Sequence, residues 1–258
     1  MRAQLLILMA IVAFTLGAVD PSDPFRSASI SAQPGASVPL DGTFTSAAGT
    51  PVTLRQLAAG KPLLIVPVQH ECPNLCGVTL SGLAHAIDGQ ARFRPGRDFA
   101  IVALGIDPRE GPAQASDDLA RLAAQRPNAK WQPAAVTGGE RTVRAVTDAL
   151  GYRYAWSPAL RQYAHLSATA VVTPAGTLST WLYGLAPTAA QLDAAVTQAA
   201  QDRGGGVMEQ IRLLCFHYDP RTGRYSLAIT RVLRLAGLAT VLLIAVGIAL
   251  LARRRGAP

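Results

Sequence analysis

Short apolar runs alternate along the middle of this chain with segments whose apolar residues recur at helical spacing. Residues 63–68 (LLIVPV) and 99–104 (FAIVAL) are unbroken apolar runs, the pattern of strands buried on both faces of a sheet. Residues 76–87 and 114–126 carry apolar side chains three or four positions apart, as one face of a helix does. The alternation predicts an α/β fold built on a central sheet.

The second half of this region continues the alternation and ends in a hairpin. Its expected elements are a weak strand (131–136), a helix ended by Gly151 (140–150), two strands (167–172 and 178–183) and a closing helix (188–200). The sequence Thr-Pro-Ala-Gly lies between the two strands and is typical of a turn. We therefore expect an α/β sandwich with a mixed central sheet.

The start of the chain predicts a secretory signal peptide. Arg2 gives a basic start, residues 3–16 are apolar and uncharged, and the small residues Gly17 and Ala18 follow. Leu16 fits the small-residue rule for cleavage poorly, so an uncleaved N-terminal anchor is the alternative. In the signal-peptide interpretation, the body of the chain is exported.

A second hydrophobic segment near the C-terminus predicts a single transmembrane helix. Residues 235–252 carry no charge, and their length suits a bilayer crossing, which needs about 20 apolar residues. Arg231 and Arg234 precede this run, and three consecutive arginines at 253–255 follow it. Because positive charge favours the cytoplasmic side, we expect the C-terminus in the cytoplasm and the main domain on the periplasmic side of a bacterial inner membrane.

These signals divide the chain into six expected parts. They are a signal peptide (1–18), a linker rich in Pro, Ser and Asp (19–35), one globular domain (36–203), a juxtamembrane segment (204–231), a transmembrane helix (232–252) and a cytoplasmic tail (253–258). The net charge of +8 overstates the basicity of the domain, because many of the arginines flank the hydrophobic ends. Without a basic stripe interleaved with aromatic residues, nucleic acid is not expected as a partner.

The sequence has three cysteines, and two of them stand close together in the domain. An odd number excludes an extensive disulfide framework and leaves at least one thiol unpaired within the chain. Cys72 and Cys76 follow the first central strand at its carboxyl end, where open α/β sheets place their functional groups. Their spacing of about one helical turn puts both sulfurs on one side of the chain. The pair can therefore form a disulfide, hold a soft metal, or do both at different times.

Two thiolates make an incomplete site for most metals, and a pair of them with one imidazole suits copper. The candidate imidazoles are His70, His85, His165 and His217. His70 is awkwardly close in sequence to Cys72, His85 is expected on the surface of a helix, and His217 lies near the membrane segment. His165 directly precedes a central strand and can return to the cysteine end of the sheet, although a lone histidine is more often structural.

Three segments resemble the SCO/SenC family of copper-carrying proteins, which belong to the thioredoxin superfamily. Residues 68–83 (VQHECPNLCGVTLSGL) are similar to the family's cysteine signature, and residues 105–112 (GIDPREGP) resemble its Asp-Pro loop. The segment 165–167 (HLS), before a strand and a turn, resembles its His-Ser segment. Gly111 stands where the family usually has threonine, and the membrane helix is C-terminal, whereas many members carry an N-terminal anchor.

The resemblance implies a thioredoxin-like fold with copper, as Cu(I) or Cu(II), bound by Cys72, Cys76 and His165. Asp107 would support the site without binding the metal. Further implied is a membrane-tethered copper chaperone that delivers copper to the dinuclear centre of cytochrome c oxidase subunit II. The alternative is a thiol-disulfide reductase that keeps the acceptor's cysteines reduced and uses the same pair. A redox-sensing regulator or a peroxidase is a weaker hypothesis.

The juxtamembrane segment holds a second candidate site. Cys215 and His217 have Cys-x-His spacing, which would serve an auxiliary metal or a contact with a membrane partner. The plainer interpretation, a strand and turn next to the membrane with an unpaired cysteine, is favoured.

Overall fold

The structure of the chain, a computed structural model, describes residues 24–31, 33, 35–71, 76–129, 131–202, 216–219, 224–227, 237 and 240. The chain divides into two compact units, and the larger unit contains the sheet and the helices around it. The expected signal peptide lies outside the described residues, as does the expected transmembrane helix except for Gly237 and Thr240. In the parts of the chain that are described, no helix has both the length and the apolar character needed to cross a bilayer.

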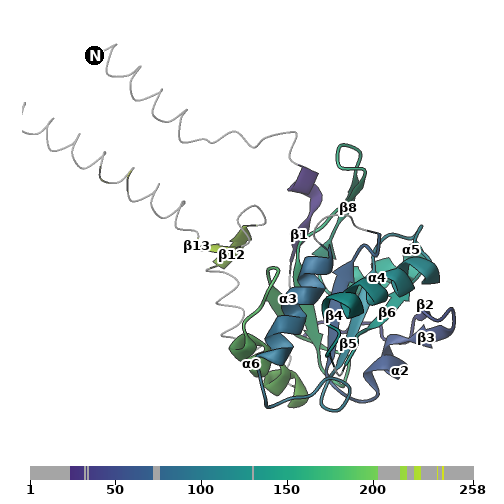
Figure 1. Cartoon of the computed structure of the whole chain (residues 1–258). Coiled ribbons are helices and arrows are strands. Elements are labelled where there is room, and N and C mark those ends of the chain that lie inside the picture. The colour runs from purple at the N-terminus through teal and green to yellow at the C-terminus, as the bar shows by residue number, and fades with distance from the viewer. Residues whose placement is uncertain are drawn as a thin grey trace, which may run out of the picture. The chain divides into compact units, whose positions relative to one another are not determined.

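A seven-stranded mixed sheet forms the centre of the larger unit (Figure 1), as the strand pattern predicts. Its order is β11-β10-β4-β5-β6-β2-β3. The bounds are β2 (Thr43–Ser46), β3 (Pro51–Thr53), β4 (Leu63–Val68), β5 (Ala100–Gly105), β6 (Ala134–Thr137), β10 (Ala168–Val172) and β11 (Leu178–Tyr183). β4, β5 and β6 are parallel, whereas β10 runs antiparallel to both β4 and β11. The expected hairpin is therefore confirmed.

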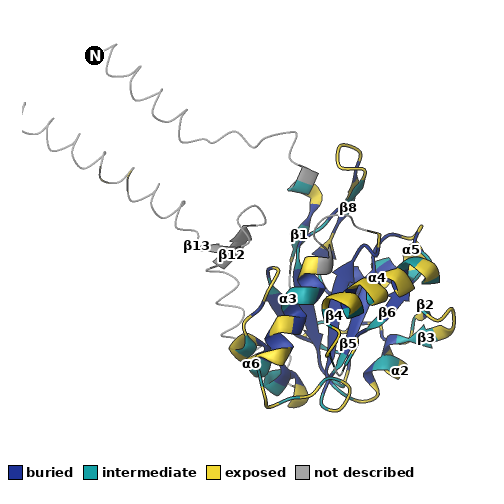
Figure 2. Cartoon of the chain, viewed as in Figure 1, coloured by how far each residue is buried: buried dark blue, intermediate teal, exposed yellow. Residues whose placement is uncertain are grey.

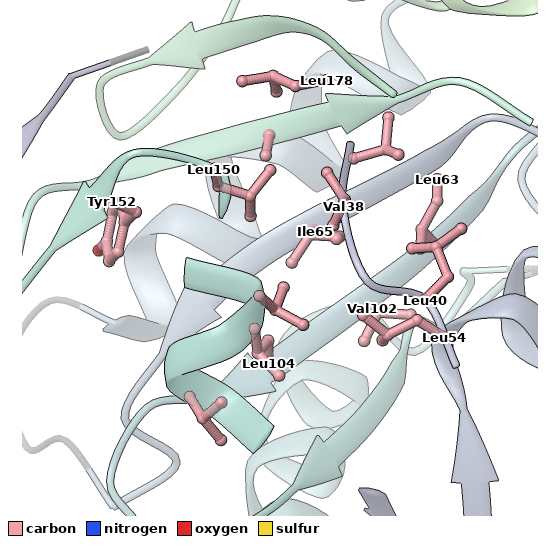
Figure 3. Close-up of a cluster of buried hydrophobic side chains, with 14 of the residues drawn as sticks. Val38, Leu40, Leu54, Leu63, Ile65, Val102, Leu104, Leu150, Tyr152 and Leu178 are labelled. Atoms are coloured by element: carbon pink, nitrogen blue, oxygen red, sulfur yellow. The ribbon is translucent and has the colours of Figure 1, made fainter. Parts of the chain in front are cut away.

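Successive residues of β4 pack on opposite faces of the sheet, as the period of a strand requires. Leu63 and Ile65 belong to one apolar cluster, and Leu64, Val66 and Val68 belong to the other. All six residues of the strand are buried. Figure 3 shows the first cluster, in which Leu63 and Ile65 lie close to Val38, Leu40 and Val102. Two-sided burial explains why the strand is an unbroken apolar run in the sequence.

Helices cover both faces of the sheet. The helices are α2 (Leu54–Ala58), α3 (Cys76–Asp88), α4 (Pro112–Gln125), α5 (Glu140–Ala149) and α6 (Ala189–Ala200), after a short 3-10 turn η1 (Pro24–Ser27). Apolar residues of α3, α4 and α6 pack into the cluster on one face, and those of α2 and α5 pack into the cluster on the other. In Figure 2 the strands are largely buried, and the outward faces of the helices are exposed. The layers match the predicted sandwich.

Several bounds differ from the predicted ones for local reasons. α4 begins at Pro112, two residues early, because proline suits the first turn of a helix. The side chain of Gln114 also accepts a hydrogen bond of 2.9 Å from the N–H of Gly111 there. The weak strand at 131–136 is displaced to β6, and Gly176 adopts φ +86° in the predicted turn.

Short elements were not predicted, because two to five residues carry too little periodicity. They include β2, β3 and α2, together with the two-stranded pairs β1 (Ser29–Ile30) with β7 (Tyr152–Arg153) and β8 (Ala155–Ser157) with β9 (Gln162–Ala164). His217 lies in β12 (Phe216–Asp219), which pairs with β13 (Arg224–Leu227).

Candidate functional site

Three segments that the sequence singled out meet at one edge of the sheet. Val68 pairs with Gly105 at the carboxyl ends of the parallel strands β4 and β5, so the cysteine segment and the Asp-Pro loop leave the sheet side by side. β10 runs the other way, with Ala170 opposite Ile65 and Val172 opposite Leu63. The start of β10, and with it the segment at 165–167, therefore lies at the same edge.

A hydrogen bond ties two of these segments together. The side-chain oxygen of Gln69 accepts a bond of 3.0 Å from the backbone N–H of Tyr163. Gln69 is the first residue after β4, and Tyr163 is in β9, two residues before His165. The strand that leads to His165 is thus hydrogen-bonded to a residue that shortly precedes Cys72.

The predicted cysteines themselves are only partly described. Cys72 lies outside the described residues, and Cys76 is the first residue of α3 with a side chain that is not described. Among the described residues no three His, Cys, Asp or Glu side chains are grouped to hold a metal. The ligand set Cys72, Cys76 and His165 therefore stays a prediction.

His165 follows β9 and is half-buried. Its Nδ1 lies 2.9 Å from the hydroxyl oxygen of Tyr152 and 3.4 Å from the backbone oxygen of Leu166. The Tyr152 hydroxyl also donates to the Leu166 oxygen at 2.6 Å. Nδ1 of His165 is therefore held by the hydroxyl of the buried Tyr152.

Asp107, expected to support the site, is buried at the start of the Asp-Pro loop and is held by Arg109. The guanidinium donates to both carboxylate oxygens, from Nε to Oδ1 at 2.8 Å and to Oδ2 at 3.2 Å, and the backbone N–H of Arg109 adds a bond of 3.0 Å. Burial alone would raise the pKa of Asp107, but the bonds and charge of Arg109 outweigh it and hold the pKa below its usual value. The guanidinium also lies 4.1 Å from the ring centroid of Trp156. Arg109, held in place by Asp107, thereby joins this loop to the β8–β9 hairpin.

His70 is a structural residue of the cysteine segment. Its side chain is fully buried, with Nδ1 at 2.9 Å from Oδ2 of Asp118 and Nε2 at 3.3 Å from the backbone oxygen of Val136. Arg121 donates to the backbone oxygen of His70. The contacts with Asp118 and Arg121 anchor the chain just before Cys72 to α4. His85 is exposed on α3, as expected.

Glu110 was missed by the sequence interpretation, although it binds the backbone of Glu71, the residue before Cys72. Its Oε1 accepts a bond of 2.8 Å from the N–H of Glu71, while Oε2 is buried without a hydrogen-bond partner among the described residues. Burial raises the pKa of this carboxyl above its usual value. A glutamate in a polar loop gives no signal of burial in a single sequence, so only the structure reveals it.

We expect replacement of Glu110 by glutamine to change the pH dependence of stability. Because the native pKa of Glu110 is raised, the folded state loses stability as pH rises from the ordinary value of 4.5 through the native value. Glutamine retains an oxygen for the Glu71 N–H and cannot ionise. Urea unfolding of both proteins should favour the variant progressively more between about pH 4 and about pH 7. A parallel dependence in the two proteins would contradict the raised pKa.

Comparison with known families decides where this chain belongs. Residues 32–201 match the model of the SCO1/SenC family, which is well over half of the chain. The chain belongs to the SCO1/SenC family. The match covers all three segments that resemble the family in sequence. A comparison with curated proteins gave no significant match.

Solved structures agree on the fold of this SCO1/SenC chain. A protein from Aquifex aeolicus described as a putative electron transfer protein is 21% identical, with a TM-score of 0.55, and covers 66% of this chain and 95% of its own. Arabidopsis thaliana ScoI, solved with copper bound, is 21% identical, with a TM-score of 0.51, over 66% of this chain and 99% of its own. The similarity establishes a thioredoxin-like α/β fold with a mixed central sheet.

Proposed function

We propose that this protein carries copper through Cys72, Cys76 and His165 and delivers it to the dinuclear copper centre of cytochrome c oxidase subunit II. The observation that carries the proposal is the meeting of the three family segments at one edge of the sheet. Two observations support this meeting of the segments. β10 pairs with β4, and Tyr163, shortly before His165, is hydrogen-bonded to Gln69, shortly before Cys72. Related Arabidopsis ScoI is a copper-bound protein.

Copper is the cargo, and the proposed donors suit it. Thiolates are soft ligands that favour copper over hard cations, and one imidazole completes a three-coordinate set for Cu(I). A site whose ligands come from separate positions along the chain can release them one at a time. Ligand exchange with the cysteines of an acceptor would then move the ion without releasing it to water. Asp107 and Glu110 would hold the surrounding loops and not the metal.

A second candidate function uses the same cysteines without His165. In a thiol-disulfide reductase, one thiolate attacks an acceptor disulfide to form a mixed disulfide, and the second thiolate resolves it. The acceptor then leaves as a dithiol, and the Cys72–Cys76 pair leaves as a disulfide. The observation in its favour is the position of Cys76 at the first turn of α3, because a helix N-terminus stabilises a thiolate.

We also propose that the domain is held at the periplasmic surface of a bacterial inner membrane by a C-terminal helix over residues 232–252. The uncharged run and the arginines on either side of it support this topology. A tether of this kind would raise the effective concentration of carrier and acceptor on one surface.

Copper titration of the full chain under reducing conditions tests the proposed carrier. We expect wild type to bind one equivalent, and His165→Ala to lose more than about 100-fold in affinity, because loss of an outer partner of a ligand alone costs about 10- to 100-fold. Cys72→Ser and Cys76→Ser should fail to bind stoichiometrically. His85→Ala, which alters an exposed histidine of α3, is the matched control and should behave as wild type.

The same proteins separate the two functions. If His165→Ala binds copper as tightly as wild type, the three-ligand site is wrong. If His165→Ala loses copper but still reduces an oxidised copper domain of subunit II at the wild-type rate, the reductase function stands beside the carrier function. Failure of the wild-type pair to reduce that disulfide excludes the reductase function.

A further inference from the structure

The hydroxyl of Tyr152 contacts Nδ1 of His165, and this contact bears on which of the two ring nitrogens carries the proton. We propose that Tyr152 is a positioning residue that holds neutral His165 with its proton on Nδ1 and so presents the lone pair of Nε2 to copper. The inference deepens the proposed copper site and rests on it for the role of His165. The tautomer itself follows from contacts within the described residues.

Counting protons among three atoms gives the tautomer. The backbone oxygen of Leu166 carries no hydrogen and lies 2.6 Å from the Tyr152 hydroxyl oxygen, a separation that requires a proton between them. The hydroxyl has only one proton, and the Leu166 oxygen takes it. The contact of 2.9 Å between the hydroxyl oxygen and His165 Nδ1 therefore needs a hydrogen supplied by the ring.

A third contact agrees with this assignment. Nδ1 of His165 also lies 3.4 Å from the Leu166 oxygen, a second acceptor for the same N–H. Two oxygens that accept around Nδ1 favour the ring form that carries hydrogen there. In a neutral imidazole the other nitrogen then has the lone pair, and a metal binds through that atom.

The tyrosine is rigid enough to impose this arrangement. Its side chain is fully buried, and its ring stacks on Trp181 with centroids 5.6 Å apart and an interplanar angle of 16°. Its backbone pairs with Ile30 in the β1–β7 ladder. Tyr152 is one of the labelled residues of the buried cluster in Figure 3. Because ring stacking and strand pairing hold Tyr152 in place, its hydroxyl would lose the contact with Nδ1 if the imidazole of His165 turned. The hydroxyl therefore sets both the tautomer and the orientation of the imidazole.

Partners of this kind are worth a measurable amount of metal affinity. A ligating histidine gains basicity and a fixed orientation when its other N–H is hydrogen-bonded, and loss of such a partner typically costs about 10- to 100-fold in affinity. We therefore expect Tyr152→Phe, which keeps the buried ring and removes the hydroxyl, to weaken copper binding by about that factor. Tyr154→Phe is the matched control, since Tyr154 is a buried neighbour, 6.1 Å from Tyr152 between ring centroids.

Nitrogen-15 NMR of the full, copper-free chain tests the tautomer without any metal. The His165 signals are assigned by their absence from the spectrum of His165→Ala. At about pH 8, above the ordinary histidine pKa, wild type and Tyr154→Phe should show a proton on Nδ1 and none on Nε2. In Tyr152→Phe the two nitrogen shifts should move toward a mixture of tautomers. A wild-type ring with its proton on Nε2 would overturn the proposal.

Copper affinities then separate a positioning role from a structural one. If Tyr152 acts through His165, the double variant Tyr152→Phe/His165→Ala should bind no more weakly than His165→Ala alone. An additional loss in the double variant, or wild-type affinity in Tyr152→Phe, would refute the positioning role. If His165→Ala itself keeps wild-type affinity, the proposed copper site fails, whereas the tautomer is still judged by the NMR spectra.

Discussion

Replacing Asp118 with alanine is expected to destabilise the protein by about 3 kcal/mol, the upper end for leaving a buried polar group without its hydrogen-bond partner. Asp118 is buried on α4, and its Oδ2 lies 2.9 Å from Nδ1 of the fully buried His70. Without it, one polar atom of that imidazole is left inside the protein with no partner. Arg121, 3.4 Å from Oδ1 of Asp118, would also lose part of its support.

Denaturant unfolding of the full chain measures this loss as a lower midpoint. Asp117→Ala is the control, because Asp117 is the neighbouring residue of the same helix and is exposed. We expect its effect to stay within about 0.5 kcal/mol. Equal effects of the two changes would mean that the His70–Asp118 contact does not contribute to stability. Because Arg121 also binds the backbone of His70, the Asp118 variant should in addition bind copper less tightly.

The second large effect is expected from Gly82→Ala in the middle of α3. A Cβ at this position would lie 2.1 Å from the backbone oxygen of Leu185 and 2.9 Å from Cα of Ala186. Both are backbone atoms, which cannot move aside as a side chain can. We expect a loss of about 3 kcal/mol, the upper end for overpacking. An unconstrained helix would instead gain up to about 1 kcal/mol from the same change.

The sign of the Gly82→Ala effect therefore tests the packing of α3. Gly139→Ala at the start of α5 serves as control, since no atom of the described residues lies within 4 Å of its Cβ position. Its effect should stay near or below about 1 kcal/mol, the usual scale at a helix cap. Increased stability in Gly82→Ala would show that α3 lies farther from residues 185 and 186. Gly82 also lets α3 lie close to residues 185 and 186. Because Cys76 begins α3, this packing also affects the position of one proposed ligand.

Most of the sheet could be predicted because its central strands β10, β4 and β5 are buried on nearly their whole length. The expected strands at 63–68 and 178–183 match β4 and β11 to the residue, and the first of them is an unbroken apolar run. The short strands β8 and β9 could not be predicted. Their stability comes from cross-strand contacts, including Trp156 against Tyr163 with ring centroids 5.5 Å apart, and not from a periodic pattern.

For the site, the residue types and their order could be read from the sequence, but the hydrogen-bond partners of those residues could not. It singled out Asp107 and His165, yet Arg109 on the carboxylate and Tyr152 on the imidazole come from contacts that local sequence does not encode. Tyr152 is thirteen residues from His165, and two intervening strands return the chain to it. His70, a metal candidate by type, proves to be occupied by Asp118 and Val136.

The sequence by itself determined the α/β class, the strands at the centre of the sheet and the family, because burial periodicity and short motifs are local properties. It also supplied the proposed ligands Cys72, Cys76 and His165 and the signals at both ends. Only the tertiary structure decided which segments meet at one edge and which side chains hold them. Those relations depend on strand register and on burial, since a carboxyl or hydroxyl acquires its role when its neighbours exclude water.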